Sequence, residues 1–255
     1  MELRDDTRPL TARSVVASTL LGVRPSRLPV RSLVASAALF GIAEGTVRTA
    51  LSRMAAAGEL VLDDGGYALA GPFLARQERQ DESRSGATVA WEGDWDLAVV
   101  EGERRPAADR AALRRATRAL RLAELREGVW LRPANLDPDR LPASRAVLAA
   151  QCLAITGRPA DAVAARLWDL DGWAGSAHAH ERLLADLEPR LGADPDVLRR
   201  AFVALATVLR HFQADPLLPE ALLPRDWPGP ALRAGYERAD AAFKAAWSSQ
   251  LRARP

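Results

Sequence analysis

The stretch that most constrains the fold is residues 42–69, where an amphipathic helix is followed directly by a short hairpin. Val47, Leu51 and Met54 recur at spacings of three and four residues, which predicts one apolar stripe along a helix. Gly58 then ends this helix, as a glycine after the last helical turn commonly does. The segments ELVLD and YALA predict two short strands, joined by an Asp-Gly-Gly turn that favours a hairpin.

The other faces of this helix carry hydroxyls and guanidinium groups, with no carboxylate over residues 45–57. The outward side chains are Thr46, Arg48, Thr49, Ser52 and Arg53. Groups of this kind bind base edges and phosphates in DNA. An ordinary solvated helix face would carry the same residue types, so the neighbouring elements have to decide between the two interpretations.

Two more helices are predicted upstream of this stretch. The first covers residues 11–22; after a basic linker broken by proline, the second begins with Pro29, and Gly41 makes the turn into the next helix. Three helices followed by a hairpin is the order of a winged helix-turn-helix domain, which presents a helix to the DNA major groove. Residues 24–53 also hold five arginines and one glutamate, a local positive excess that suits nucleic acid. We therefore expect residues 1–86 to form a DNA-binding winged helix-turn-helix domain.

The composition of the whole chain narrows the class of protein further. With 255 residues, 48% of them hydrophobic, the chain can build two or three packed domains, and its formal net charge is only +2. The lone cysteine, Cys152, cannot form an intramolecular disulfide or a paired-cysteine metal motif, which suits a reducing cytosol. No uncharged apolar run approaches the roughly 20 residues that span a membrane, and the N-terminus lacks an apolar signal core. We therefore expect a cytoplasmic protein that does not enter a membrane.

The middle of the chain alternates between strand and helix patterns. The predicted strands are residues 95–100, 128–133 and 146–155, and the predicted helices are residues 107–122 and 161–170. This β-α-β-β-α order predicts a ferredoxin-like domain over residues 87–170, with a last strand missing from the pattern.

Residues 171–255 are again helical by their apolar spacing, apart from a proline-rich segment. That segment, residues 215–230, holds five of the seventeen prolines among large apolar residues, so it cannot be helical and is expected to pack as an ordered, extended loop. The three parts together predict an α+β multidomain fold with a winged helix-turn-helix, a ferredoxin-like middle domain and an α-helical C-terminal domain.

Three motifs resemble those of one known family and follow its order along nearly the whole chain. They are GTVRTALSRM at residues 45–54 with Gly58, WEGDW at 91–95 with GVWLRP at 128–133, and DPLLP at 215–219 with LLPRDWPG at 222–229. These motifs resemble the PaaX family of bacterial transcriptional repressors. The resemblance implies a homodimeric repressor of aromatic catabolism that binds a palindromic operator in double-stranded DNA. It also implies release of the operator by an aryl-CoA or other acyl-CoA effector, phenylacetyl-CoA in the name-giving members.

The tip of the hairpin departs from the family, in which it is usually basic. The candidate DNA-binding residues are Arg31, Thr46, Arg48, Thr49, Ser52 and Arg53. At the hairpin tip, Asp63 and Asp64 would repel a phosphate, so we expect the wing to support the helix instead of entering a groove. The charge needed for binding then falls more heavily on Arg24, Arg27 and Arg31.

The effector and the operator lead to two further expectations. Trp227, beside Arg225 in the proline-rich segment, could present an aromatic wall and a phosphate partner to an acyl-CoA. Dimerisation would set two recognition helices about 34 Å apart, so the operator should be an inverted repeat.

Other chemistries have weaker support in the sequence. His178, His180 and His211 could be metal ligands, but two histidines separated by one residue point about 200° apart on a helix, so we expect no metal site. Asp94 and Asp96, near the first strand of the ferredoxin-like domain, could serve a nuclease, but no second ligand set accompanies them. No glycine-rich phosphate loop, serine nucleophile elbow or Cys–His signature is present, so we expect neither an enzyme nor a cofactor. The acidic wing keeps one alternative open, a ligand-sensing or nuclease-like α+β protein whose winged helix mediates protein contacts.

Overall fold

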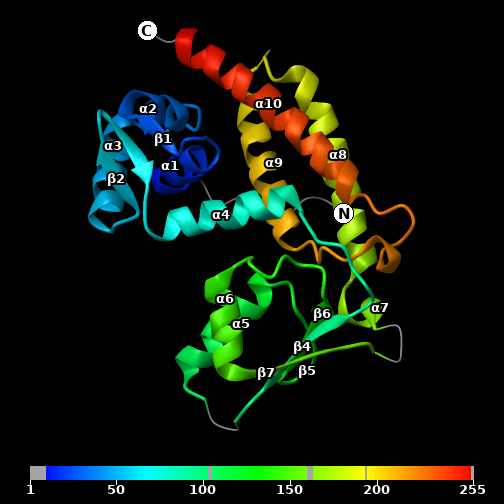
Figure 1. Ribbon diagram of the computed structural model, residues 1–255. Helices are drawn as coiled ribbons and strands as arrows, with labels where there is room; N and C mark the ends of the chain where they lie inside the picture. Colours follow the sequence, from blue (N-terminus) through cyan, green and yellow to red (C-terminus); the bar gives the residue numbers. More distant parts are fainter. Residues whose placement is uncertain (1–9, 103–104, 160–162, 193, 254–255) are drawn as a thin grey trace. The chain divides into compact units, whose positions relative to one another are not determined.

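The structure, a computed structural model, describes residues 10–102, 105–159, 163–192 and 194–253. It is a mixture of helices and two small antiparallel sheets (Figure 1). These residues form two compact units, each assembled from separate stretches of chain. The first unit contains the described residues up to Arg84, together with 180–213 and those from Ala231 onward; the second contains 85–179 and 214–230. The expected division into three consecutive domains, 1–86, 87–170 and 171–255, stays a prediction.

The first unit contains a small sheet and most of the long helices. Its strands are β1 (Arg27–Pro29), β2 (Leu60–Asp63) and β3 (Gly66–Leu69). Its helices are α1 (Ala12–Leu21), α2 (Val30–Ala38), α3 (Glu44–Ala56), α4 (Pro72–Ser85), α9 (Pro195–Gln213) and α10 (Gly229–Ala253). Helix α8 (Leu170–Leu187) begins in the second unit and ends in the first.

Helix α3 and the hairpin behind it form where the sequence predicts them. Val47, Leu51 and Met54 are buried in one core with residues of α1, α2 and α4, so the predicted apolar stripe is confirmed. Strands β2 and β3 pair antiparallel, with Val61 opposite Ala68. Burial of three large apolar side chains stabilises α3 by several kcal/mol in total, at about 1.5–3 kcal/mol each.

The segment before α2 differs from the prediction of a linker, because residues 27–29 form the edge strand β1 beside β3. Pro29 is the last residue of this strand, and α2 begins one residue later. A proline is compatible with an edge strand because its missing N–H removes no interior hydrogen bond. Opposite it, a Cβ on Gly66 would lie 2.5 Å from the carbonyl oxygen of Leu28, so the close approach of β1 requires glycine at this position.

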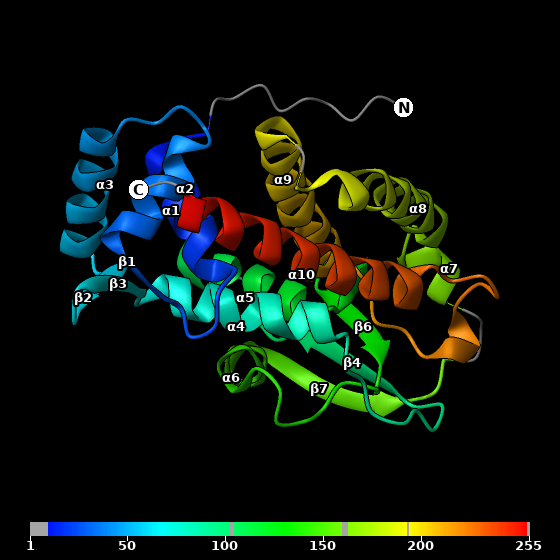
Figure 2. The same cartoon turned by 90° about the horizontal axis from the view of Figure 1, so that it is seen from above.

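Helices α9 and α10 lie side by side, and the end of α10 lies beside α2 (Figure 2). Phe212 of α9 meets Tyr236 of α10 edge-on, with ring centroids 5.6 Å apart. The helical pair also touches the N-terminal elements, since the Phe40 and Phe202 rings lie 5.1 Å apart. The N-terminal helices and the C-terminal helices are thus parts of one compact unit.

The second unit is built around a four-stranded antiparallel sheet with the order β5-β6-β4-β7. Its elements are β4 (Trp95–Val100), α5 (Ala107–Ala119), β5 (Ala123–Arg126), β6 (Val129–Pro133), α6 (Pro142–Gln151), β7 (Cys152–Gly157) and α7 (Ala164–Leu167). The predicted strands at 95–100 and 128–133 and the predicted helix after Ala107 are confirmed. The predicted strand at 146–155 is wrong in its first half, which is the end of α6, while its second half opens β7. Of the helix predicted at 161–170, 161 and 162 lie outside the described residues, and α7 covers four residues.

The proline-rich segment, residues 215–230, is ordered and packed as expected, but it is not extended throughout, because Glu220–Leu222 form a short 3-10 helix and α10 begins at Gly229. Leu217 and Leu218 are buried, and the Leu217 carbonyl accepts hydrogen bonds from the side chains of Asn135 (2.9 Å) and Arg132 (3.2 Å). Arg132 is only 2% exposed, and its guanidinium also donates to the Leu120 carbonyl at 3.1 Å. One buried arginine therefore holds the loop against the end of α5. Among the helices of the described ranges, none is long and apolar enough to cross a membrane.

Candidate nucleic-acid interface

Helix α3 presents a continuous polar face opposite its buried stripe. The candidate residues on this face are all exposed: Thr46, Arg48, Thr49, Ser52 and Arg53. The sequence pattern predicts which side faces outward because α3 has a single buried side, formed by its three core residues. What the pattern does not reveal is which of these groups already have partners.

Three of the candidate groups on α3 are engaged within the helix itself. Arg48 donates from Nε to the Glu44 carboxylate at 2.7 Å, which offsets its charge. The Thr49 hydroxyl donates to the Gly45 carbonyl at 2.9 Å, and the Ser52 hydroxyl donates to the Arg48 carbonyl at 3.1 Å. Both hydroxyl oxygens keep lone pairs, so in this state they can accept a hydrogen bond from a base amino group.

The arginines of α3 and of the segments before it divide into paired and unpaired groups. Arg24 forms a bidentate ion pair with Asp81 and also donates to the Leu21 carbonyl at 2.9 Å. Within the described part of the chain, Arg31 and Arg53 have neither a hydrogen bond nor an ion pair, and both are exposed. The positive charge that is open to a phosphate is therefore concentrated on these two residues.

The hairpin tip is tied to β1 by Arg27. Its guanidinium lies 3.2 Å from the Asp63 carboxylate and donates to the backbone carbonyls of Asp63 (3.2 Å) and Asp64 (2.8 Å). Arg27 therefore offsets part of the acidity that the sequence places at the wing. The expectation that the wing supports α3 and stays out of a groove remains a prediction.

A hollow beside α3 brings three of the candidate residues together. Thr46, Thr49 and Arg53 line it, whereas Arg31, Arg48 and Ser52 do not. Arg13 and Glu59 also line it, and Arg13 of α1 donates to Glu59 in a bidentate ion pair. This hydrogen bond lowers the pKa of the Glu59 carboxyl and raises that of Arg13. No local sequence pattern indicates this ion pair, because its partners are 46 residues apart.

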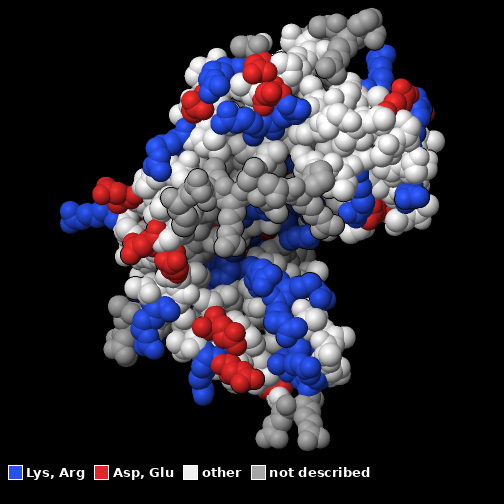
Figure 3. Space-filling view, turned by 180° about the vertical axis from the view of Figure 1, so that it is seen from behind, with Lys and Arg blue, Asp and Glu red and all other residues white. Residues whose placement is uncertain are grey.

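A second set of exposed arginines lies in the second unit, along α5. They are Arg110, Arg114, Arg115 and Arg118. In the back view of Figure 3, basic side chains gather in the lower half, with some acidic side chains among them. The spacing of four residues from Arg110 to Arg118 was the available sequence signal for this surface. Like charges on one helix face attract a polyanion.

The residues predicted to hold an effector, Arg225 and Trp227, have different surroundings. Trp227 stacks on Trp173, with ring centroids 4.4 Å apart and planes inclined by 18°. Arg225 is exposed, and neither residue lines the hollow in the second unit formed by Trp91, Trp95 and Arg158 with their neighbours. The stacking covers one face of Trp227, so that ring has at most one face left for a ligand.

The residues considered for metal chemistry have other surroundings. Asp94 pairs with Arg158 at 2.7 Å. His180 is buried, which lowers its pKa, and its ring meets that of His211 edge-on at 5.0 Å. Across the described ranges, no group of three or more histidine, cysteine or acidic side chains is placed to hold a metal ion.

An N-terminal unit with three helices and a hairpin, in a chain that closes with long helices, has the element order of a winged-helix regulator. The profile of the family described as "PaaX-like protein" matches residues 11–72, and that of the "PaaX-like protein C-terminal domain" matches residues 168–252. The chain therefore belongs to the PaaX family, as its motifs indicate, and this membership points to a transcription regulator.

One solved structure shares the fold over nearly the whole chain. It is described as uncharacterized protein Rv0674 from Mycobacterium tuberculosis, is 42% identical, and superposes with a TM-score of 0.74. The match covers 94% of this chain and 98% of that one. No curated protein sequence matches this chain.

Proposed function

We propose that the protein is a DNA-binding transcriptional repressor that acts as a homodimer on an inverted-repeat operator and is released by an acyl-CoA. The observation that carries this proposal is the exposed polar face of α3, where Thr46, Thr49 and Arg53 converge on one hollow. Its position after two helices and before a hairpin is that of a recognition helix.

The proposed roles follow from the hydrogen-bond donors and acceptors that each side chain has left unused. Arg31 and Arg53, which have no partner among the described residues, would contact phosphates or guanine edges. The hydroxyls of Thr49 and Ser52 would accept hydrogen bonds from bases. Alternatively, they would donate to a phosphate in place of the helix carbonyls that they now contact. Arg48 would first have to leave Glu44, so its contribution to affinity is smaller than that of Arg53.

The effector acts only if it binds the DNA-incompetent dimer more tightly than the competent one, because equal binding shifts nothing. In this proposal Arg225 supplies the phosphate partner for an acyl-CoA, and the open face of Trp227 the aromatic wall. The ferredoxin-like assignment of the second unit is part of the same proposal. Its support is the β-α-β-β-α-β order of β4 to β7 and the strand order β5-β6-β4-β7.

A titration of the purified chain with its own promoter DNA tests the proposal. Fluorescence anisotropy at one fixed salt concentration should show saturable binding, reversed by an aryl-CoA or another acyl-CoA thioester. Arg53→Gln should weaken operator binding about tenfold, equivalent to about 1.4 kcal/mol. Arg79→Gln changes an exposed arginine of α4 that does not line the hollow beside α3; it is the matched control and should change little. No binding at low salt would remove the repressor function and favour a protein-contact role for the winged helix.

A further inference from the structure

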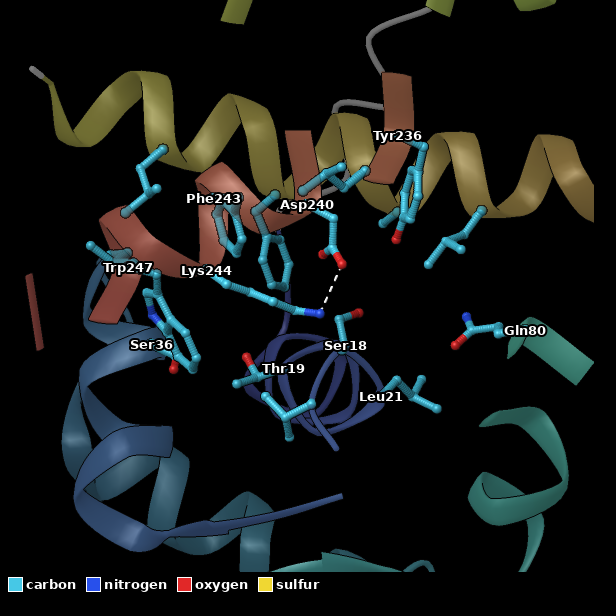
Figure 4. A pocket seen from close by; sticks show the side chains of 18 of the residues that line it. Ser18, Thr19, Leu21, Ser36, Gln80, Tyr236, Asp240, Phe243, Lys244 and Trp247 are labelled. Atoms are coloured by element: carbon cyan, nitrogen blue, oxygen red, sulfur yellow. Dashed lines mark hydrogen bonds and ion pairs between the residues drawn. The ribbon is translucent and has the colours of Figure 1, made fainter. Parts of the chain in front are cut away.

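Helices of the first unit line a partly open, mainly apolar cavity of about 120 Å³ (Figure 4). Its walls come from α1, α2, α4, α9 and α10. Phe40, Phe202 and Phe243 form an aromatic wall, in which the Phe202 ring lies 5.1 Å from Phe40 and 6.2 Å from Phe243. Leu205 and Trp247 extend the apolar lining.

The volume limits what this cavity can hold. An engineered apolar cavity of about 150 Å³ takes up benzene, whereas drug-sized ligands occupy roughly 300–1,000 Å³. A space of about 120 Å³ therefore fits one ring or a short branched chain, but not a whole cofactor-sized molecule. Any larger ligand would place only one end here.

Two buried polar atoms on the cavity wall lack partners. The Thr19 hydroxyl oxygen and the Gln80 amide oxygen form no hydrogen bond within the described chain, although their residues are only 5% and 7% exposed. Both side chains are labelled in Figure 4, at the edge of the open space. Such atoms cost stability unless something bonds to them, and in native structures they are uncommon. The Thr19 hydroxyl can donate to an anionic guest, whereas the Gln80 amide oxygen only accepts and so requires a donor.

The cavity also has a cationic edge. Lys244 and Arg84 share the Asp240 carboxylate at 2.8 and 3.0 Å, and Arg84 also pairs with the Glu237 carboxylate, so these two cations are balanced by two carboxylates. Arg76 also lines the cavity, but it has no hydrogen bond or ion pair in the described chain. Arg210 lines it as well, and among the described residues its guanidinium donates only to the Thr207 hydroxyl of its own helix, at 3.0 Å. Two guanidinium groups without a carboxylate favour an anion.

We propose that this cavity binds a small organic anion that buries one ring-sized apolar end against Phe40 and Phe202 and places its anionic end against Arg76 and Arg210. A free aryl carboxylate carries its charge next to the ring, whereas an aryl-CoA thioester is uncharged there and would place its phosphates beyond the cavity edge, at the far end of the CoA arm. The bound end would lie against α2 and against Phe40, which precedes the turn into α3. A role as the operator-releasing effector site rests on the proposed function, whereas the binding itself does not.

Isothermal titration calorimetry of the full chain without DNA tests the binding. The probes are benzoate, phenylacetate, their CoA thioesters and the uncharged benzyl alcohol, each up to about 1 mM. We expect one anionic form to bind, and a comparison of acid with thioester identifies which source supplies it. Absence of binding by all four anionic probes overturns the proposal.

Cavity-filling variants locate the site. Ala206→Phe fills the space from α9 and should weaken binding at least about tenfold. Val203→Phe adds the same ring at an exposed position of α9 outside the lining and should leave affinity unchanged. Ser18→Leu fills the space from α1 and provides a second variant if Ala206→Phe does not fold. Equal losses at positions 206 and 203 would contradict the assignment, as would full affinity in Ser18→Leu.

Variants of Arg76 and Arg210 test whether these two side chains bind the anionic end of the ligand. The double variant Arg76→Gln, Arg210→Gln should weaken the anionic probes while leaving benzyl alcohol unaffected, and Arg200→Gln, exposed on α9, should change neither. An equal loss for charged and uncharged probes contradicts the cationic edge. Operator binding is measured separately on ligand-free protein. Binding of the probes without binding of DNA would support this site and contradict the proposed function. Binding of DNA without binding of the probes would contradict the site alone.

Discussion

Arg27 neutralises Asp63 across the wing: the guanidinium on β1 lies 3.2 Å from the carboxylate at the end of β2. The same side chain donates to the carbonyl of Asp64 at 2.8 Å. A basic residue expected to face DNA is therefore part of the scaffold that fixes the hairpin tip. The ion pair reduces the negative charge at the hairpin tip.

Arg27→Ala should weaken operator binding while hardly changing stability. The pair is exposed on both sides, and exposed pairs contribute about 0–1 kcal/mol, so the melting temperature should shift little. The unpaired Asp63 carboxylate would then repel nearby phosphates. Adding Asp63→Asn to this variant should restore part of the affinity. An anisotropy titration in which the double variant binds no better than Arg27→Ala would contradict this explanation.

Gly66→Ala should destabilise the first unit by about 1–3 kcal/mol, because the added methyl meets a backbone carbonyl that cannot move freely. The nearest atom, the Leu28 carbonyl oxygen, is 2.5 Å from the Cβ position. Gly45→Ala is the matched control on α3, where no atom lies within 4 Å and alanine should add about 0.5–1 kcal/mol of stability. Urea unfolding of both variants measures the difference. Equal stabilities would mean that β1 can separate from β3 at little cost.

Arg132→Leu should destabilise the second unit by about 2–4 kcal/mol, because buried carbonyl groups lose their donor. The side chain serves the carbonyls of Leu120 and Leu217 and the Asn135 amide oxygen. We expect the proline-rich loop to become sensitive to limited proteolysis before the whole chain unfolds. Arg126→Leu, on the exposed part of β5, should leave both stability and the digestion pattern near those of the wild type.

Local sequence patterns predicted the long helices and strands, but not the short strands that depend on pairing with segments distant in the sequence. The stripe of Val47, Leu51 and Met54 predicts α3 because burial on one face imposes a helical period. Strand β1 has only three residues, too few for an alternating pattern, and exists through its pairing with β3. Strand β5 is equally hard to read because only its first residue is buried.

The sequence predicted which side chains of the candidate site are exposed, but not which of them form ion pairs. The outward face of α3 follows from its period, whereas the partner of Arg24, Asp81, lies 57 residues away in the chain. The cavity was out of reach for the same reason. Its aromatic wall joins Phe40 with Phe202, and no local pattern indicates that such distant segments meet.

The burial of His180 makes the stability of the first unit depend on pH. Burial lowers its pKa in the folded state, so the unfolded chain binds the proton more readily than the folded one. Stability should therefore be fully present above the ordinary histidine pKa of about 6.5 and fall as the pH drops below it. His180→Phe should flatten the decrease in melting temperature between about pH 7.5 and about pH 5.5. His178→Gln, at an exposed position of α8, should retain the wild-type decrease. An unchanged pH dependence in His180→Phe would assign the effect to other groups.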